Sequence, residues 1–149
     1  MNLLAQRVLS SSLYIEKKRI VSSDRGILAL VGFEKGDTSS DCEIIADKLL
    51  NYRIFSDDKG RMENSVIDIK GDLLLVPEVT LAIETRKGTR PSFSEAASPD
   101  LGKLLFDDLS NRLRDTHNRL EVGIFGADME IKLINDGPLT FLFKSSDSK

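Results

Sequence analysis

The chain has few of the residues that build disulfides, zinc sites or membrane spans. Its 149 residues include one cysteine, Cys42, and one histidine, His117. A single cysteine cannot form an intrachain disulfide, and together the two residues offer no plausible zinc constellation. No apolar run approaches the roughly 20 residues of a membrane helix, and Gln6 and Arg7 interrupt the first apolar segment, unlike a signal-peptide core. We therefore expect a cytoplasmic protein with no membrane partner and no metal bound by cysteine or histidine.

An excess of positive charge is also missing. The formal net charge is −3, which does not indicate a general nucleic-acid-binding surface, so we expect no DNA partner and only small, local contacts with any RNA. Hydrophobic residues make up 40% of the chain and charged residues 30%, a globular composition. The length suits one domain over residues 1–149, with a frayed polar tail at 144–149.

Apolar runs and alternations predict strands at both ends of the chain. Residues 3–8 read as a strand, and 13–15 with 19–21 read as a hairpin with a charged tip. Residues 27–31 are continuously apolar and predict a buried strand. Further strands are expected at 52–55, 73–76, 80–83, 121–124, 129–134 and 139–143, with an interruption at Pro77 because proline cannot donate to a ladder.

Two segments have helical spacing instead. Apolar residues recur at helical intervals from Thr38 to Asn51, and Ser40 with Glu43 forms a capping-box pattern. Cys42 falls on the apolar face of this helix, which favours a core residue over a reactive thiol. The second helix begins with Ser98 as N-cap and runs to about Thr116.

His117 follows the second helix, where a cation near the last carbonyls is stabilising, and we prefer this interpretation to a catalytic role. Strands before, between and after two helices predict a sheet-rich α/β or α+β domain, and no regular βαβ repeat forces a parallel arrangement.

Two loop stretches are candidates for function. The segment 84–93 holds the only clustered cations, Arg86, Lys87 and Arg90, and is either a solvated loop or a phosphate-binding loop. The stretch 135–138, Asn-Asp-Gly-Pro, concentrates residues that favour tight turns, and taken alone it reads as an ordinary hairpin turn.

Taken together, several stretches resemble the D-aminoacyl-tRNA deacylase family, also called D-tyrosyl-tRNA deacylases. They occur in the family's order over nearly the whole chain. The matching stretches are Gln6-Arg7-Val8, Gly36-Asp37-Thr38, Asn51 with Arg53-Ile54-Phe55, Thr80-Leu81, Thr85 with Lys87-Gly88, Arg90-Pro91-Ser92-Phe93, Ala96-Ala97, Phe125-Gly126-Ala127-Asp128-Met129, and Asn135-Asp136-Gly137-Pro138 with Thr140.

The resemblance implies a fold of largely antiparallel, barrel-like sheets with two main helices. It also implies a homodimeric hydrolase that needs no metal and no other cofactor. Its substrate would be the ester between a D-amino acid, or glycine, and the 3′-terminal adenosine at the acceptor end of tRNA. Such an enzyme serves chiral proofreading and translation quality control.

The resemblance also assigns roles to residues. Gly137 and a cis-proline at Pro138 would reach into the partner's pocket and exclude L-amino acids by their rigid main chain. The N–H groups of Val79 and Thr80 would stabilise the developing oxyanion, while an older family interpretation makes the Thr80 hydroxyl a nucleophile. Phe125 and Met129 would line the adenine pocket, although core packing is the commoner role for such residues, and Ala97 would stand near the substrate amino group. The cations at 86, 87 and 90 would contact tRNA phosphates.

One stretch departs from the family pattern. Where the family usually has serine, glutamine and phenylalanine, this chain has Pro77, Glu78 and Val79. Proline removes a backbone donor, and Glu78 puts a negative charge where a neutral amide is expected, next to or within the catalytic site. The sequence therefore leaves two hypotheses: an active deacylase, or a catalytically weak or inactive homodimeric homologue that binds the tRNA acceptor end.

Overall fold

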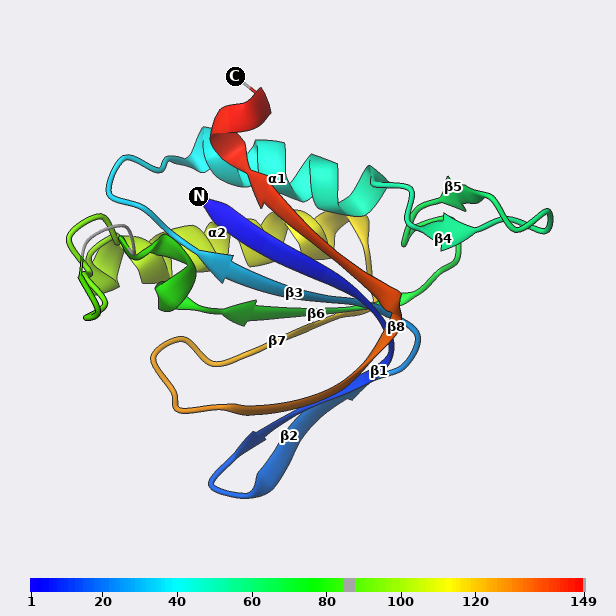
Figure 1. The fold of residues 1–149 in the computed structure, drawn as a ribbon, viewed down its shortest axis with the longest axis horizontal. Helices are drawn as coiled ribbons and strands as arrows, with labels where there is room; N and C mark the ends of the chain where they lie inside the picture. Colours follow the sequence, from blue (N-terminus) through cyan, green and yellow to red (C-terminus); the bar gives the residue numbers. More distant parts are fainter. Residues whose placement is uncertain (85–87, 149) are drawn as a thin grey trace.

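A long bent strand, β1 (Asn2–Ile15), lies at the centre of the fold in the computed structural model, which describes residues 1–84 and 88–148. One edge of β1 pairs antiparallel with β3 (Gly26–Gly32) along its first half and with β2 (Lys18–Ser23) along its second half. The other edge pairs antiparallel with β8 (Glu130–Lys144) on both halves. In Figure 1 the bend of β1 and β8 curls the sheet into an incompletely closed barrel.

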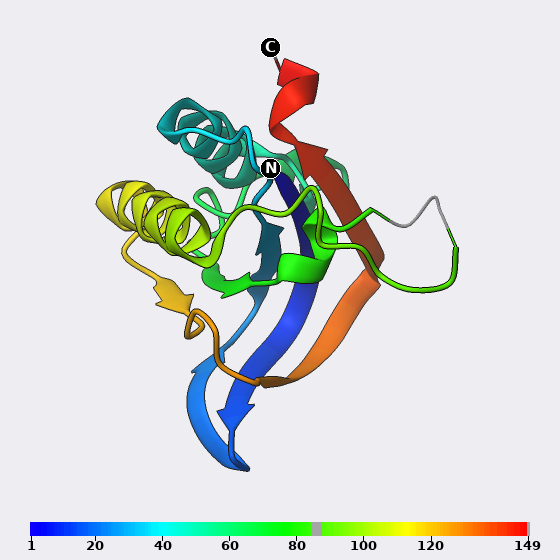
Figure 2. The same cartoon turned by 90° about the vertical axis from the view of Figure 1, so that its left-hand side faces the viewer.

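Two parallel pairs extend this sheet. β3 pairs with β6 (Asp72–Pro77), and β6 pairs with β7 (Leu120–Val122). Parallel neighbours need long crossovers, which here contain α1 (Ser39–Asn51) and α2 (Pro99–Thr116). Figure 2 shows both helices side by side over one face of the sheet. The predicted mixed fold with two main helices is confirmed, and the crossovers explain why part of the sheet is parallel.

The main core fills the space between the helices and the sheet. Cys42, Ile45 and Leu49 of α1 and Leu105 and Leu109 of α2 are at most 3% exposed and belong to one cluster with inward residues of the sheet. The apolar spacing predicted the face of α1 correctly. On α2 it also put Leu104 on the apolar stripe, and this is wrong, because Leu104 is 65% exposed. Burial of each large aliphatic side chain contributes roughly 1.5–3 kcal/mol, so this layer fixes the helices on the sheet.

Three local predictions are wrong in detail. The capping box of α1 lies two residues earlier than predicted: Asp41 Oδ2, not Glu43, accepts bonds from Thr38 N at 2.9 Å and Thr38 Oγ1 at 2.8 Å. The segment expected as a strand at 80–83 is a 3₁₀ helix, η1 (Val79–Ala82), with Glu78 at its N-cap. Only Phe55–Ser56 (β4) of the strand predicted at 52–55 forms, and it pairs with β5 (Met62–Asn64).

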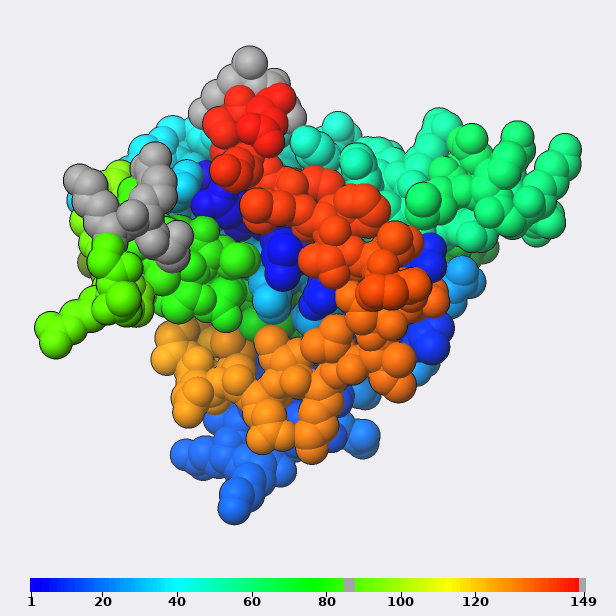
Figure 3. All heavy atoms as spheres, viewed as in Figure 1, coloured from blue at the N-terminus to red at the C-terminus, as the bar shows by residue number. Residues whose placement is uncertain are grey.

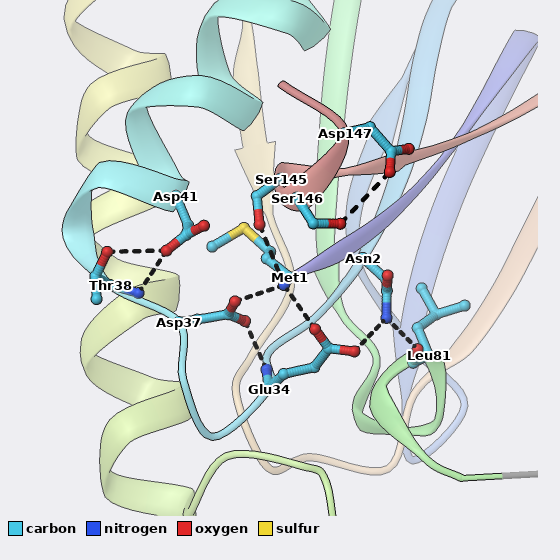
Figure 4. A network of polar contacts seen from close by, with 10 residues as sticks. All are labelled: Met1, Asn2, Glu34, Asp37, Thr38, Asp41, Leu81, Ser145, Ser146 and Asp147. Atoms are coloured by element: carbon cyan, nitrogen blue, oxygen red, sulfur yellow. Dashed lines mark hydrogen bonds and ion pairs between the residues drawn. The ribbon is translucent and has the colours of Figure 1, made fainter. Parts of the chain in front are cut away.

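The two ends of the described chain meet beside α1. The Met1 ammonium contacts Glu34 Oε2 at 3.0 Å, Asp37 Oδ1 at 2.5 Å and Ser145 Oγ at 3.4 Å (Figure 4). Ser145 opens the short helix η2 (Ser145–Ser148) and is only 2% exposed. The predicted fraying therefore does not begin at Lys144, because the Met1 contacts hold the start of this tail.

Candidate functional site

A pocket of about 480 Å³ opens where β6 ends, between the N-terminus of α2 and the segment before β8. Most of its wall is apolar. Its lining residues are Val31, Phe33, Val76, Pro77, Glu78, Val79, Ala97, Ser98, Pro99, Gly102, Phe125, Gly126, Ala127, Asp128, Met129 and Ile131. Among the residues that the structure describes, Glu78 and Asp128 are the two ionisable ones in the lining, so this part of the wall carries negative charge and no positive charge. The pocket thus suits a ligand with an apolar part and a cationic group.

Glu78 and Thr80 form a small polar unit at one side of this pocket. Glu78 N donates to Val31 O at 2.7 Å, which fixes the backbone where β6 leaves the sheet. Glu78 Oε1 accepts from Thr80 N at 3.2 Å and makes a short contact with Thr80 Oγ1. No hydrogen bond is described for the Val79 N–H. Of the two predicted oxyanion donors, Val79 N–H is therefore available to a ligand, while Thr80 N–H is already used by Glu78.

The residues predicted to bind substrate lie on other walls of the same pocket. Phe125 packs near Phe106, with ring centroids 6.1 Å apart, and Met129 packs against the second core cluster. Ala97 N donates to Phe33 O at 2.9 Å, which ties the start of α2 to the end of β3. The structure thus brings Ala97, Phe125 and Met129 together with Glu78 and Val79, whereas Thr80 lies outside the lining.

The stretch 135–138 is not a hairpin turn, so the interpretation made from turn residues alone is wrong. It lies within the single strand β8: Thr140 pairs with Gln6 and Asn135 pairs with Val8, so four residues of β8 stand opposite Arg7 alone. These residues form a loop whose Gly137–Pro138 peptide is cis. Gly137 has φ +136° and, like Pro138, is exposed. The loop does not line the pocket of its own chain.

Arg7 holds this loop in place. Its Nε donates to Asp136 O at 3.2 Å and lies 3.0 Å from Asp136 Oδ2, while Nη1 donates to Ile54 O at 2.7 Å. Asn135 braces the other side, since its Oδ1 accepts from Leu139 N at 2.8 Å. The Arg7 side chain is only 13% exposed, so these are largely shielded contacts. The loop is therefore held in a fixed conformation.

The remaining candidates do not join the pocket. Arg90 is exposed, and Arg86 and Lys87 lie outside the described residues, so their phosphate contacts stay predictions. His117 is the C-cap of α2, but its buried ring contacts Gly71 O at 2.8 Å through Nε2 rather than the last carbonyls of the helix. Within residues 1–84 and 88–148 there is no cluster of side chains suited to a metal ion, and no helix there is long and apolar enough to cross a membrane.

Cys42 is an inert core thiol. Burial, reinforced by the nearby charge of Asp108, raises the pKa of the Cys42 thiol to about 12, and Sγ lies 3.5 Å from Leu105 O. We expect an aromatic disulfide reagent at pH 8 to leave the native protein unlabelled and to label it in proportion to the unfolded fraction as urea is added. Fast labelling without urea would contradict this.

The same shift has a consequence for stability. The folded pKa lies above the unfolded value of 9.0, so the contribution of Cys42 is complete below pH 9 and is lost as pH rises toward 12.

Sequence reasoning missed two parts of the site. Asp128 was seen only as part of a motif, and Arg7 only as a neighbour of Gln6 and Val8. A charged residue in an otherwise apolar strand was the available signal for Arg7. Its partner could not be found, because Asp136 lies 129 residues away and meets Arg7 only through the β1–β8 register.

Sequence comparisons place the chain among known proteins. Residues 4–144 match the model of a family described as D-Tyr-tRNA(Tyr) deacylase. A D-aminoacyl-tRNA deacylase of Teredinibacter turnerae is 50% identical over 145 residues, covering 97% of this chain and all of that one. A protein of the same name from Francisella tularensis is 45% identical over 141 residues, covering 95% of this chain and 97% of that one.

Solved structures have the same fold. One described as c-Myc DNA Unwinding Element Binding Protein superposes with a TM-score of 0.93 at 31% identity, covering 97% of this chain and 98% of that one. Another, a probable eukaryotic D-amino acid tRNA deacylase, has a TM-score of 0.85 at 18% identity and covers 95% of this chain and 97% of that one. The second likeness bears on the fold alone.

Proposed function

This chain belongs to the D-Tyr-tRNA(Tyr) deacylase family, and from that premise we propose that it is a hydrolase that removes D-amino acids from tRNA by cleaving their ester bond. The observation that carries the proposal is the pocket. In a chain that matches the family over residues 4–144, it gathers Glu78 and Val79, Ala97, and Phe125 with Met129 around one cavity. The pocket is large enough for the end of an aminoacylated nucleotide, as a member of this family requires.

The chemistry needs a positioned ester rather than a strong nucleophile. Water adds to the carbonyl carbon, the bond from that carbon to the ribose oxygen breaks, and the proton from water ends on the leaving oxygen. We propose that the Val79 N–H, which has no partner among the described residues, stabilises the oxyanion that develops. We propose that the adjacent ribose 2′-hydroxyl of the substrate assists the proton transfer. Phe125 and Met129 would hold the adenine.

The exclusion of L-amino acids is assigned to the loop at Gly137 and Pro138. Because this loop does not line the pocket of its own chain, it acts on a second copy, and we propose that the active form is a homodimer. β8 supports this: it pairs with β1 alone, so its outer edge is open within the described chain, and it exposes Ile134 at 55% and Leu142 at 52%. β8 crosses the face shown in Figure 3.

A comparison of D-tyrosyl-tRNA with L-tyrosyl-tRNA tests the function. The purified protein should release tyrosine from the D-ester well above the buffer rate and leave the L-ester intact. Glycyl-tRNA, which has no side chain to exclude, should behave like the D-ester. No release from the D-ester above buffer would reject the proposal.

The alternative of a non-catalytic acceptor-end binder rests on Pro77, Glu78 and Val79. It predicts salt-sensitive tRNA binding without turnover, and activity that appears when Ser, Gln and Phe are restored at these three positions. The same assay distinguishes the two functions.

Dimerisation has its own test. We expect sedimentation equilibrium at assay concentration to give twice the chain mass of 16.6 kDa. Ile134→Glu, which places a charge on the exposed face of β8, should shift the protein toward monomer and reduce deacylation together with it. Glu130→Lys, at an already charged exposed position of the same strand, is the matched control. A monomeric and fully active wild-type protein would contradict the proposal.

A further inference from the structure

We propose that Glu78 binds the α-ammonium group of the aminoacyl ester and so makes this protein selective for esters of amino acids with a free amino group. The inference rests on the proposed function and names a specificity-determining residue within it. It starts from a departure in the sequence, since the resemblance predicts a neutral amide at position 78 and this chain has a carboxylate.

The carboxylate of Glu78 is fixed by one of its two oxygens. Both hydrogen bonds from Thr80, one from N and one from Oγ1, go to Oε1. Oε2 has no hydrogen-bond partner described in residues 1–84 and 88–148. Thr80 therefore positions the carboxylate, and Oε2 can accept a bond from a ligand without breaking the contacts that hold the group. A preorganised acceptor loses little conformational entropy on binding.

The surroundings favour a cation at this oxygen. Val31, Pro77 and Val79 adjoin Glu78 in an apolar part of the pocket wall. A ligand seated against this wall would shield its ionic contact with Glu78 from water, which strengthens the contact. Within residues 1–84 and 88–148, the lining contains no lysine, arginine or histidine to neutralise the carboxylate. The cation carried by an aminoacyl ester is its α-ammonium, two bonds from the ester carbonyl. An ammonium on Glu78 would thus place the carbonyl next to the free N–H of Val79, the following residue.

The test compares two esters that differ in this one group. D-phenylalanyl-tRNA carries an ammonium, and D-3-phenyllactyl-tRNA carries a hydroxyl of similar size in its place. Each enzymatic rate is divided by the spontaneous rate of the same ester, because the ammonium also activates the ester chemically. Wild-type protein should prefer the ammonium ester by about 10- to 100-fold, the scale of one hydrogen bond between charged groups.

Glu78→Gln should bring the two normalised rates within about threefold of one another. Thr80→Val, which removes the hydroxyl but keeps the N–H, should give an intermediate preference, since it loosens the carboxylate without discharging it. Glu121→Gln, the same charge change at an exposed position of β7 outside the pocket, should keep the wild-type preference. Both esters carry the same tRNA, so the ratio cancels any general effect of charge on tRNA binding.

A second measurement does not depend on turnover. The ligands are the 3′-amides of 3′-amino-3′-deoxyadenosine with D-phenylalanine and with D-3-phenyllactic acid, in which a stable amide replaces the ester. Wild-type protein should bind the first at least tenfold more tightly by calorimetry, and Glu78→Gln should bind both alike. If the protein hydrolyses neither ester but still binds the D-phenylalanine amide more tightly, the proposed function is rejected and the ammonium site is retained.

Three outcomes would overturn the assignment. The first is a Glu78→Gln protein that keeps the wild-type preference in rate and in binding. The second is a wild-type protein without any preference. The third is an Asp128→Asn protein that loses the preference while Glu78→Gln keeps it, which would move the ammonium to the other acidic residue described in the lining.

Discussion

Replacing Arg7 with methionine is expected to raise hydrolysis of L-tyrosyl-tRNA relative to D-tyrosyl-tRNA at least about tenfold. Methionine keeps an unbranched apolar stem like that of arginine but removes the bonds to Asp136 O and Ile54 O and the ion pair with Asp136. With that support gone, the Gly137–Pro138 loop loses its fixed conformation and no longer excludes L side chains from the partner's pocket. The unfolding free energy should also fall by about 2 kcal/mol, since charged hydrogen bonds are lost in a largely shielded setting.

Arg53→Met is the matched control. Arg53 also makes an ion pair, with Glu63 at 3.0 Å, but the two side chains are 67% and 47% exposed. Such pairs contribute roughly 0–1 kcal/mol, so urea unfolding and the D-to-L ratio should both stay close to wild type. An Arg7→Met protein that still rejects L-esters would show that the loop is held without Arg7.

The largest loss of stability is expected from Gly26→Ala. A Cβ built on Gly26 would lie 1.8 Å from Asp72 O, 2.6 Å from Asp72 C and 2.7 Å from Asp72 N. These are backbone atoms of the strand that pairs with β3, so no side chain can turn away to make room. The start of the β3–β6 ladder would have to separate. We expect the unfolding free energy, measured by urea denaturation and circular dichroism, to fall by more than about 4 kcal/mol.

Gly36→Ala controls for the loss of a glycine as such. A Cβ at Gly36 has nothing within 4 Å, so the change should stay within about 1 kcal/mol. A Gly26→Ala protein as stable as the wild type would mean that β3 and β6 can move apart at this point without cost.

Sequence patterns predicted the parts of the fold that depend on near neighbours. The Ser98 cap of α2, its apolar stripe apart from the exposed Leu104, and the buried runs in β3 and β6 are visible within a few residues, and they form as predicted. The segment after Pro77 was mistaken for a strand because its apolar residues suit either structure. The Glu78 side chain accepts a hydrogen bond from Thr80 N, which caps a 3₁₀ helix at this point instead of a strand.

Long-range pairing explains what the sequence did not predict. Residues 135–138 contain the usual residues of a tight turn, so a hairpin was the natural local interpretation. Their role as a loop within one strand depends on β1, which pairs with β8 on both sides of Arg7. The pocket was beyond local patterns for the same reason, because Glu78, Ala97 and Phe125 come from three separate segments. The family resemblance named these three residues as candidates for one site. The structure added that Oε2 of Glu78 has no hydrogen-bond partner among the described residues.

The pairing of β8 on the two sides of the loop has a further consequence. Ala5 pairs with Phe141 before the loop and Leu13 with Ile131 after it, so eight steps along β1 match ten along β8. Neighbouring residues of a strand face opposite sides of the sheet, so an odd difference would exchange the inward and outward residues in one half of β8. The loop between Gln6 and Val8 adds three residues to β8, and a second register shift, between Val8 and Ser10, removes one. The total difference is therefore two, and Phe141 and Ile131 both face the interior. The loop can therefore change its sequence, or its length by an even number of residues, while the barrel keeps its inner surface.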